Sequence, residues 1–480
     1  MRRVILPLLL VLAFRPVLAQ CPDGTLPPCG PQPAHAPSVA ILFMEPRSRN
    51  AADSLLAEGL TLEIISTLSG VTRLDVKSRF FSRRIAAAAD PVRSARSFGV
   101  DYVVDGVLEL DSARVLVRGA LTRTSTGRVV RPIRVERRRA ELEGLQVAVA
   151  REVAAAVVGQ LLPAERSRFA VRRVDPRVTE LLLGARALLG QYTEAALRQA
   201  VVLAGQAIAF DSMYAPSWVR LAWSYGLLRD FVRDSNLAYG DRSMAASERA
   251  LALDSSNATA MSLVAAHHVE RNDLSAHNEA LARRSAGLES GVESAMILAA
   301  VLLDRGKIEE ALGVINGAAR RDSLSPVIWA SAASRLREAR HFGEGARAWE
   351  RALALRPSAT DSLALQRARR WARLETGDCA AALVDGRSAQ DMFLIVESLR
   401  CLGRAAEADS VIDSRIALSS TGPSSRAIYL AWRNQSDSAF AVLDRAYPRW
   451  LNETLQHPAF DPYRQRPAYL ALQRRMGLDR

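Results

Sequence analysis

The sequence predicts a mixed α/β domain followed by an all-α superhelical solenoid of repeated helix pairs. Three observations support this prediction. Strand and helix patterns alternate within residues 38–165, whereas from about residue 175 onward almost only helical periodicity remains. Strings of one shape then recur and end at Asp211, Asp254, Glu289, Asp322 and Arg356, at spacings of 43, 35, 33 and 34 residues. A period near 34 residues indicates stacked helix pairs.

The first residues predict export. A basic start is followed by an apolar stretch over residues 4–14, and Val17-Leu18-Ala19 places small or apolar residues where a signal peptidase cleaves. The apolar stretch is too short to span a bilayer as a helix. Residues 1–19 are therefore expected to be a signal peptide, with the mature chain beginning at Gln20 in the periplasm and containing no transmembrane span.

Residues 20–37 are rich in Pro, Gly and Cys and are expected to form an extended leader before the first domain. Within it, Leu18-Ala19-Gln20-Cys21 is close to a lipoprotein signal, although the residue before the cysteine is usually small. A mature chain that begins at lipidated Cys21 is thus the alternative to cleavage after Ala19, and it would make the protein an outer-membrane lipoprotein.

Composition and charge describe a globular chain with a basic first domain. Hydrophobic residues make up 49% of the chain and charged residues 24%, which is typical of a folded soluble protein. Residues 20–174 hold 23 basic and 16 acidic groups, whereas residues 175–480 hold 38 and 35. Only Arg137-Arg138-Arg139 clusters tightly, and no aromatic residues are interleaved with it. We therefore expect a solvated basic face and no nucleic-acid partner.

The α/β domain, residues 38–165, contains a series of short patterns. The predicted strands are 38–43, 74–77, 101–110, 114–122 and 129–137, and the predicted helices are 51–68, 86–98 and 142–162. Strands separated by helices predict parallel pairing, and the last three strands, separated by turns, predict antiparallel pairing. The sheet is therefore expected to be mixed.

The same residues resemble the TolB-like N-terminal domain. The string GVDYV at residues 99–103 is the most specific match, and the helix ADSLLAEGLTLEIISTL and the hairpin around Thr126-Gly127 follow the same family pattern. The loop after the first strand, Leu42-Phe43-Met44-Glu45-Pro46, departs from it. The resemblance implies a non-catalytic domain that is often fused to helical repeats, and it does not imply the propeller of TolB itself.

The helical region, residues 175–456, resembles tetratricopeptide (TPR) repeats. The unit that opens at Ala215 carries the pattern Trp218, Leu221, Ala222, Tyr225, and the unit that opens at Pro326 has Trp329, Trp349, Ala352 and Pro357. About eight units are expected, with an insertion near residues 230–239 to account for the longest spacing. Residues 457–480 resemble the closing segment of such fusions, and Phe460, Tyr463, Tyr469, Leu470 and Leu472 are expected to cover the last helix pair.

Motifs for catalysis and cofactor binding are missing from the sequence. It has no Walker loop, no GxGxxG after a strand, no HExxH and no GxSxG. His267-His268 with His277 could be read as metal ligands, but adjacent helical residues point about 100° apart, so ordinary surface histidines are favoured. Glu309-Glu310 lies at the acidic start of a helix, where the helix dipole favours it. We expect no enzyme activity, no metal and no cofactor.

Five residues are candidates for contact with a partner. Trp223 and Trp371 fall near positions that line the inner groove of TPR proteins, and core packing is the equal alternative for both. Arg337, Arg367 and Arg400 occupy comparable first-helix positions, where a solvated surface is the alternative. Trp218 and Trp329 are expected to be core residues.

Two disulfides are predicted. Cys379 and Cys401 are both eleven residues from residue 390, so they face each other if the helices on either side of this turn are antiparallel. The alternative is two buried thiols that fill a tight helix contact. Cys21 and Cys29 in the leader are the companion pair, with no element to fix their positions. An oxidising periplasm would allow both bonds.

Together these features predict a non-catalytic periplasmic adaptor or scaffold that binds an unidentified protein or peptide through the TPR groove, with arginines favouring acidic groups. The alternative is a small-molecule sensor whose TolB-like domain signals through the solenoid. An enzyme is the least favoured class, because acid, base and nucleophile groupings are missing.

Overall fold

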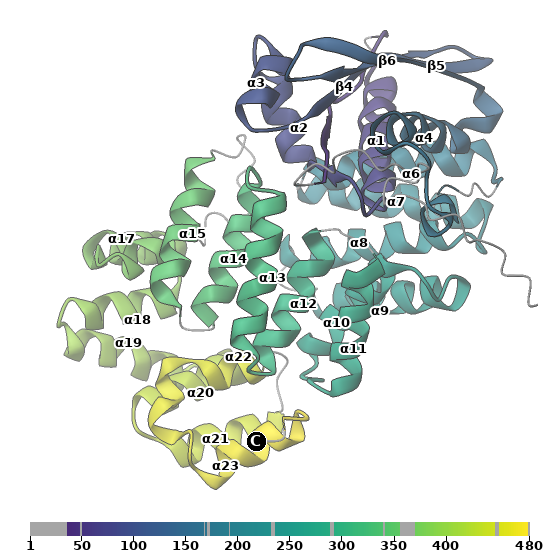
Figure 1. Cartoon of the computed structure of the whole chain (residues 1–480). Helices are drawn as coiled ribbons and strands as arrows, with labels where there is room; N and C mark the ends of the chain where they lie inside the picture. Colours follow the sequence, from purple (N-terminus) through teal and green to yellow (C-terminus); the bar gives the residue numbers. More distant parts are fainter. Residues whose placement is uncertain are drawn as a thin grey trace, which may run out of the picture.

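The structure is a computed structural model. It describes residues 36–478 except 49, 168, 170–172, 192, 232–235, 289–291, 339–340, 356–369 and 447–450. The predicted signal peptide (1–19), the leader cysteines Cys21 and Cys29, and Arg367 lie outside the described residues. The described chain is mostly helical, with a small mixed sheet near its N-terminus (Figure 1).

The sheet has the strand order β3-β1-β4-β5-β6, and β2 pairs with β4 off this path. Its strands are β1 (Ser38–Ile41), β2 (Glu45–Pro46), β3 (Asp75–Val76), β4 (Tyr102–Leu110), β5 (Arg114–Arg123) and β6 (Arg128–Arg138). β1 pairs parallel with β3 and β4, whereas β4, β5 and β6 pair antiparallel. The mixed sheet is thus confirmed, and β2 is a strand that the sequence patterns did not indicate.

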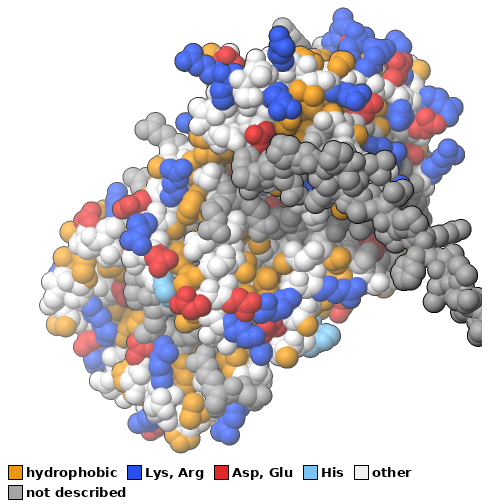
Figure 2. All heavy atoms as spheres, viewed as in Figure 1, with side chains coloured by type: hydrophobic (Ala, Val, Ile, Leu, Met, Phe, Trp, Pro, Cys, Tyr) orange, Lys and Arg blue, Asp and Glu red, His pale blue; other side chains and the backbone are white. Residues whose placement is uncertain are grey.

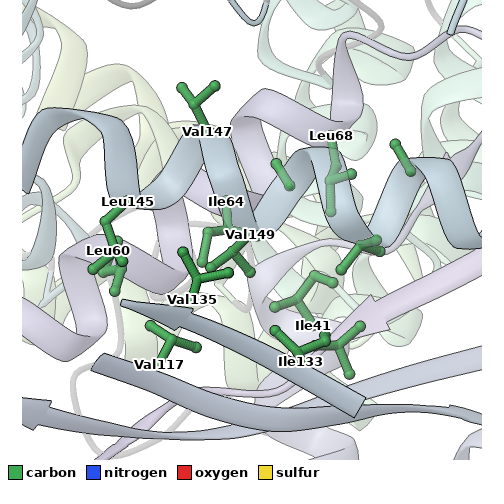
Figure 3. Packing of buried hydrophobic residues seen from close by; sticks show 14 of the residues in the cluster. Ile41, Leu60, Ile64, Leu68, Val117, Ile133, Val135, Leu145, Val147 and Val149 are labelled. Atoms are coloured by element: carbon green, nitrogen blue, oxygen red, sulfur yellow. The ribbon is translucent and has the colours of Figure 1, made fainter. Parts of the chain in front are cut away.

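Two helices cover one face of this sheet. In α1 (Ala51–Ser69) the residues Leu56, Leu60, Ile64 and Leu68 recur every fourth position and are buried, and the Asn50 side chain caps the helix by accepting from Ala52 N at 2.8 Å. The second helix is α4 (Leu145–Val158), which follows the short helix η1 (Arg139–Gly144). Their apolar side chains interdigitate with those of β5 and β6 (Figure 3).

The other face of the sheet is partly covered by two short helices, α2 (Arg79–Ala86) and α3 (Pro91–Ser97). The prediction of one helix over residues 86–98 is therefore wrong. Asp90 begins a new helix because its side chain accepts a hydrogen bond from Arg93 N, and Pro91 occupies a position at the helix start, where its missing N–H costs nothing.

From residue 176 onward the described helices form antiparallel pairs that stack side by side (Figure 1). The pairs are α6 (Pro176–Gln191) with α7 (Glu194–Phe210), α8 (Ala215–Phe231) with α9 (Asn236–Leu253), α10 (Ala258–Glu270) with α11 (Ala276–Leu288), α12 (Val292–Asp304) with α13 (Ile308–Arg321), α14 (Pro326–Glu338) with α15 (Phe342–Ala354), the helical residues 370–375 with α17 (Cys379–Ala389), α18 (Met392–Cys401) with α19 (Ala405–Ala417), and α20 (Pro423–Trp432) with α21 (Ser436–Ala446). Buried alanines such as Ala222, Ala299 and Ala352 allow these helices to approach closely.

The C-terminal segment packs on the last pair and also reaches back to earlier ones. It consists of α22 (Leu451–Gln456), η2 (Pro458–Tyr463) and α23 (Pro467–Arg475). Phe460, Tyr463, Tyr469 and Leu472 are buried, and Leu470 is partly buried in the same cluster. Leu274 N donates to Met476 O at 3.1 Å, and Asn452 Nδ2 donates to Asp304 Oδ1 at 2.9 Å. The segment therefore ties α20 and α21 back to α10 and α12.

The α/β domain also contacts the solenoid at two places. The first is formed by α1 and η1 against α6, where Leu183 joins the core of the α/β domain, and Arg220 of α8 pairs there with Glu63. The second is between α2 and the turn that joins α13 to α14, where Leu324 is buried among Ala40, Phe81 and Ile85. Between the two regions lies α5 (Pro163–Ser167), whose Glu165 pairs with Arg73 at 2.9 Å. The predicted boundary near residues 165–175 stays a prediction.

Candidate functional site

Two of the predicted contact residues, Arg337 and Trp371, touch each other. The Arg337 guanidinium on α14 lies 3.8 Å from the centroid of the Trp371 ring, which belongs to the first helix of the next pair. Arg337 Nε is also 3.0 Å from Glu375 Oε1, one helical turn after Trp371. Trp371 is only 8% exposed, and it belongs to one buried cluster with Ala382 and Leu394. The core alternative for Trp371 therefore holds alongside its contact with Arg337.

The contact continues across the following pairs. Glu397 on α18 lies 3.7 Å from Arg337 and 3.4 Å from His457, the N-cap residue of η2. The His457 ring meets Trp432 of α20 edge to face at 5.1 Å between centroids, and Arg400 lies 5.0 Å over the Trp432 ring. We call these residues the ladder, because they link the first helices of four successive pairs to the C-terminal segment. The ladder consists of Arg337, Trp371, Glu375, Glu397, Arg400, Trp432 and His457.

The ladder includes three of the five predicted residues. Trp223 lies elsewhere, half-buried between the α6–α8 and α8–α10 packing clusters, and Arg367 is outside the described residues. The sequence analysis missed Glu375, Glu397, Trp432 and His457. Glu375 stands four residues after Trp371 and Glu397 three before Arg400, which places each on the same helix face as a predicted residue.

Charges within the ladder are largely matched. Burial raises the pKa of Glu375 to about 7, the neighbouring Glu397 adds to the rise, and Arg337 opposes it. The Arg337 guanidinium thus lies between the carboxylates of Glu375 and Glu397. Arg400 in turn lies 3.9 Å from Asp409. Because these arginines already have acidic neighbours within the chain, the expected preference for acidic partners finds no support in the ladder.

The cysteine pair lies beside the ladder. The structure places Cys379 and Cys401 at disulfide distance, with Cα atoms 6.0 Å apart. α17 and α18 are antiparallel around Gln390, whose left-handed φ of 54° turns the chain between them. This is the geometry that equal spacing from residue 390 predicted. Arg400 precedes Cys401 in the chain, so the cysteine pair fixes the end of α18 that carries this residue of the ladder.

A separate hollow of about 400 Å³ lies between α9 and α10. Its lining includes Asp241, Glu248, His267, His268 and Arg271. His268 pairs with Asp273 at 2.8 Å, and Arg271 pairs with Asp241 at 2.6 Å. Within the described residues no group of three or more His, Cys, Asp or Glu side chains has the arrangement of a metal site.

None of the helices in the described part of the chain has the length and apolar character needed to cross a membrane. No protein-family model matches this chain. One curated protein, named "Putative adenylate cyclase 3" from Rhizobium meliloti (strain 1021), is 27% identical over 213 residues. That alignment covers 44% of this chain but only 36% of the relative, so the chain matches about a third of the relative's length.

Solved structures with some similarity are tetratricopeptide proteins. The TPR protein TTC0263 of Thermus thermophilus is 19% identical, with a TM-score of 0.29, 33% of this chain and 81% of that chain covered. YrrB, described as a TPR protein with an unusual peptide-binding site, is 15% identical, with a TM-score of 0.26, 40% of this chain and 91% of that chain covered. These TM-scores do not establish a common overall fold; the helix pairing described above carries the repeat assignment.

Proposed function

We propose that this protein is a non-catalytic adaptor, exported to the periplasm, that binds a segment of a protein partner along the ladder. The N-terminal residues support export, and the string GVDYV at residues 99–103 supports a TolB-like first domain. The stacked helix pairs support a scaffold role, because such arrays present extended binding surfaces.

The observation that carries the proposal is the continuity of the ladder. Its side chains, except that of His457, come from the first helices of four successive pairs, and cation–π contacts, an edge-to-face ring contact and ion pairs hold them in place. A surface that is ordered before binding loses little conformational entropy when a partner docks. Tryptophan and arginine are also the residues that most often dominate binding energy at protein interfaces.

The exposed parts of the ladder indicate how contact would be made. The side chains of Arg337 and Arg400 are 31% and 36% exposed, whereas both carboxylate oxygens of Glu375 are buried. A partner would meet the outer faces of the stacked guanidinium groups. A substrate would not reach the Glu375 carboxylate, despite its raised pKa, and this favours binding over catalysis.

A peptide array tests the binding role. Peptides that bind the mature chain should lose about tenfold in affinity for the double variant Arg337→Gln/Arg400→Gln. The control is Arg351→Gln, since Arg351 is an exposed arginine on α15, the second helix of the pair that contains Arg337. Equal binding by both variants would contradict a role for the ladder, and turnover in a substrate screen would contradict the non-catalytic assignment.

Export is tested separately by the N-terminus of the mature protein. Cleavage after Ala19 leaves Gln20 as the first residue, and N-terminal sequencing of material from the periplasmic fraction should find it. A chain that begins at lipidated Cys21 would place the protein on a membrane, and an uncleaved chain in the cytoplasm would contradict export.

A further inference from the structure

The two ends of the β4-β5-β6 sheet differ in how their arginines are paired. At the end formed by the start of β5, Arg118 lies 3.5 Å from Glu109, and Arg114 and Arg134 each lie 3.1 Å from Glu136. Acidic and basic residues alternate here across neighbouring strands. Each of these three arginines is therefore neutralised within the sheet.

At the other end, around the β5–β6 turn, arginines gather without acidic partners in ion-pair distance among the described residues. Arg123 of β5 and Arg128 of β6 stand directly opposite each other. Arg131 of β6 stands opposite Leu121, which precedes Arg123 by two residues on β5. Arg96 of α3 reaches the same turn, where its Nε donates to Thr124 O at 2.5 Å. None of these four arginines, which we call the hairpin arginines, forms an ion pair with any residue that the structure describes.

This arrangement costs free energy in the isolated protein. Like charges directly opposite each other on neighbouring strands are destabilising. All four hairpin arginines are exposed, and Figure 2 shows Lys and Arg side chains gathered over the α/β domain with few acidic ones among them. An anionic partner would remove the repulsion, because its charges would lie between the arginines.

The same end of the sheet offers an unpaired strand edge. Among the strands that the structure describes, β6 is the last of the sheet and pairs with β5 alone. Its register with β5 shifts at Val130, between the pairs Leu121–Arg131 and Thr122–Val129. Its first residues are all exposed, and Val129 and Val130 are 57% and 42% exposed. Ala120 N turns toward β4, where it donates to Asp105 Oδ1 at 3.0 Å. Its cross-strand partner Pro132 therefore turns its backbone away from β5, so the missing N–H of this proline falls on the open edge.

We propose that the hairpin arginines and the edge of β6 over residues 128–131 dock an extended acidic segment of a protein, which adds to the sheet as a further strand. The backbone of such a segment pairs with the open edge, its carboxylates lie against Arg123, Arg128 and Arg131, and its apolar side chains cover Val129 and Val130. The added strand ends at Pro132, which offers no N–H. An anionic lipid surface would satisfy the charges but would leave the open backbone groups and the valines without partners.

Charged residues and proline on an edge strand also protect proteins against aggregation, and this is the ordinary explanation for β6. The two explanations predict different behaviour toward acidic peptides. Protection alone predicts binding that depends only on total charge. Strand addition also requires a peptide backbone that can form the regular hydrogen bonds of a β-strand.

The experiment measures binding of a fluorescent peptide of alternating Glu and Val to the full mature chain by anisotropy. The comparison peptide has the same number of glutamates, with prolines in place of the valines, so that it carries equal charge but cannot pair as a strand. On the unmodified protein we expect at least about tenfold weaker binding of the proline peptide. Equal binding of the two peptides would overturn strand addition.

Two triple variants locate the surface. The test variant is Arg123→Gln/Arg128→Gln/Arg131→Gln, which should weaken binding of the Glu-Val peptide about tenfold. The control is Arg114→Gln/Arg118→Gln/Arg134→Gln, which makes the same change in net charge on the same sheet. It should weaken binding less than about twofold. Equal losses would show that only total charge matters and would overturn the proposal. Binding to vesicles of phosphatidylglycerol with no difference between the two peptides would assign the surface to a membrane instead.

Discussion

The two contacts between the α/β domain and the solenoid are built in different ways. Where α1 meets α6, the backbones approach so closely that a Cβ atom added at Gly59 would lie 2.2 Å from Leu183 O. Where α2 meets the α13–α14 turn, the contact depends on side chains: Leu324 fills an apolar socket, and Asp322 accepts a hydrogen bond from Ser78. The first contact leaves no space between the backbones, whereas the second depends on side chains, chiefly Leu324 with Leu355 beside it, and on one titratable group.

The first contact also contains a partly buried ion cluster. Glu63 of α1 lies 2.6 Å from Arg220 of α8 and 3.9 Å from Arg186 of α6. Burial lowers the pKa of Arg220 to about 10, with the nearby Arg186 adding to the effect. One carboxylate therefore compensates two guanidinium groups, and this contact should tolerate very little change.

Gly59→Ala should produce the largest loss. The added methyl group meets backbone rather than a movable side chain, so α1 and α6 must separate, at a cost of about 3 kcal/mol in the free energy of unfolding. Chemical denaturation measures it. The matched control is Gly205→Ala in α7, where the structure shows nothing within 4 Å of the added atom and the change should stabilise by about 0.5–1 kcal/mol. Similar results for both variants would show that the close approach is not maintained in solution.

The sequence was informative wherever a contact lies within one element or one helix pair. The apolar spacing of α1 and the alternation in β4 to β6 locate these elements to within a few residues, because each pattern is set by local geometry. Cys379 and Cys401 could be paired because both belong to helices that flank one turn. The long spacing before Asp254 predicts an insertion near residues 230–239. In the structure part of this spacing comes from longer helices, because α8 and α9 span 17 and 18 residues whereas α10 has 13.

Contacts between distant elements could not be predicted in this way. Arg337 and Trp371 were selected from their repeat positions, but that they touch depends on how successive pairs stack. His457 joins the ladder only because the C-terminal segment folds back onto α20. Ser78 and Asp322 are 244 residues apart, and neither lies in a motif. Repeat periodicity determines the pairs and leaves their curvature open.

Leu324→Ala should produce the next largest effect. The side chain is buried among residues of the α/β domain, so truncation leaves a cavity and should cost about 2 kcal/mol. Because the contact is remote from the chain connection, we expect hydrogen exchange to increase in α2 more than in α1. Leu418→Ala, at an exposed leucine, is the control and should change stability by less than about 0.5 kcal/mol. Unchanged exchange in α2 would argue against docking at this turn.

Glu63→Gln should have a smaller effect, of about 1–2 kcal/mol. The substitution keeps the size of the side chain but leaves Arg186 and Arg220 without their shared carboxylate, and partial exposure of Glu63 to solvent moderates the loss. Thermal unfolding measures it against Glu407→Gln, whose fully exposed pair with Arg404 is screened by water and should leave the melting temperature almost unchanged. Equal values would indicate that water reaches the cluster.

Measured per pH unit, the smallest effect is the pH dependence of the second contact. Burial raises the pKa of Asp322 to about 7, with Glu293 adding to the rise and Ser78, Arg79 and Lys77 opposing it. The docked carboxyl therefore retains its proton at pH values where the undocked carboxyl, with its usual pKa of 3.8, has lost it. Docking takes up a proton between these two values.

The contact is thus strongest near pH 4, weakens as the pH rises toward 7, and is constant above that, with a slope of at most about 1.4 kcal/mol per pH unit. Hydrogen exchange of α2 between pH 5 and pH 8, corrected for the intrinsic rate, should follow this slope in the unmodified protein. It should be flat in Asp322→Asn, which keeps the acceptor for Ser78 without the charge. Glu375→Gln is the control, because among the described carboxyls Glu375 also has a pKa raised to about 7, and it lies in the ladder. A slope that disappears in Glu375→Gln and persists in Asp322→Asn would locate the titration in the ladder instead of the interdomain contact.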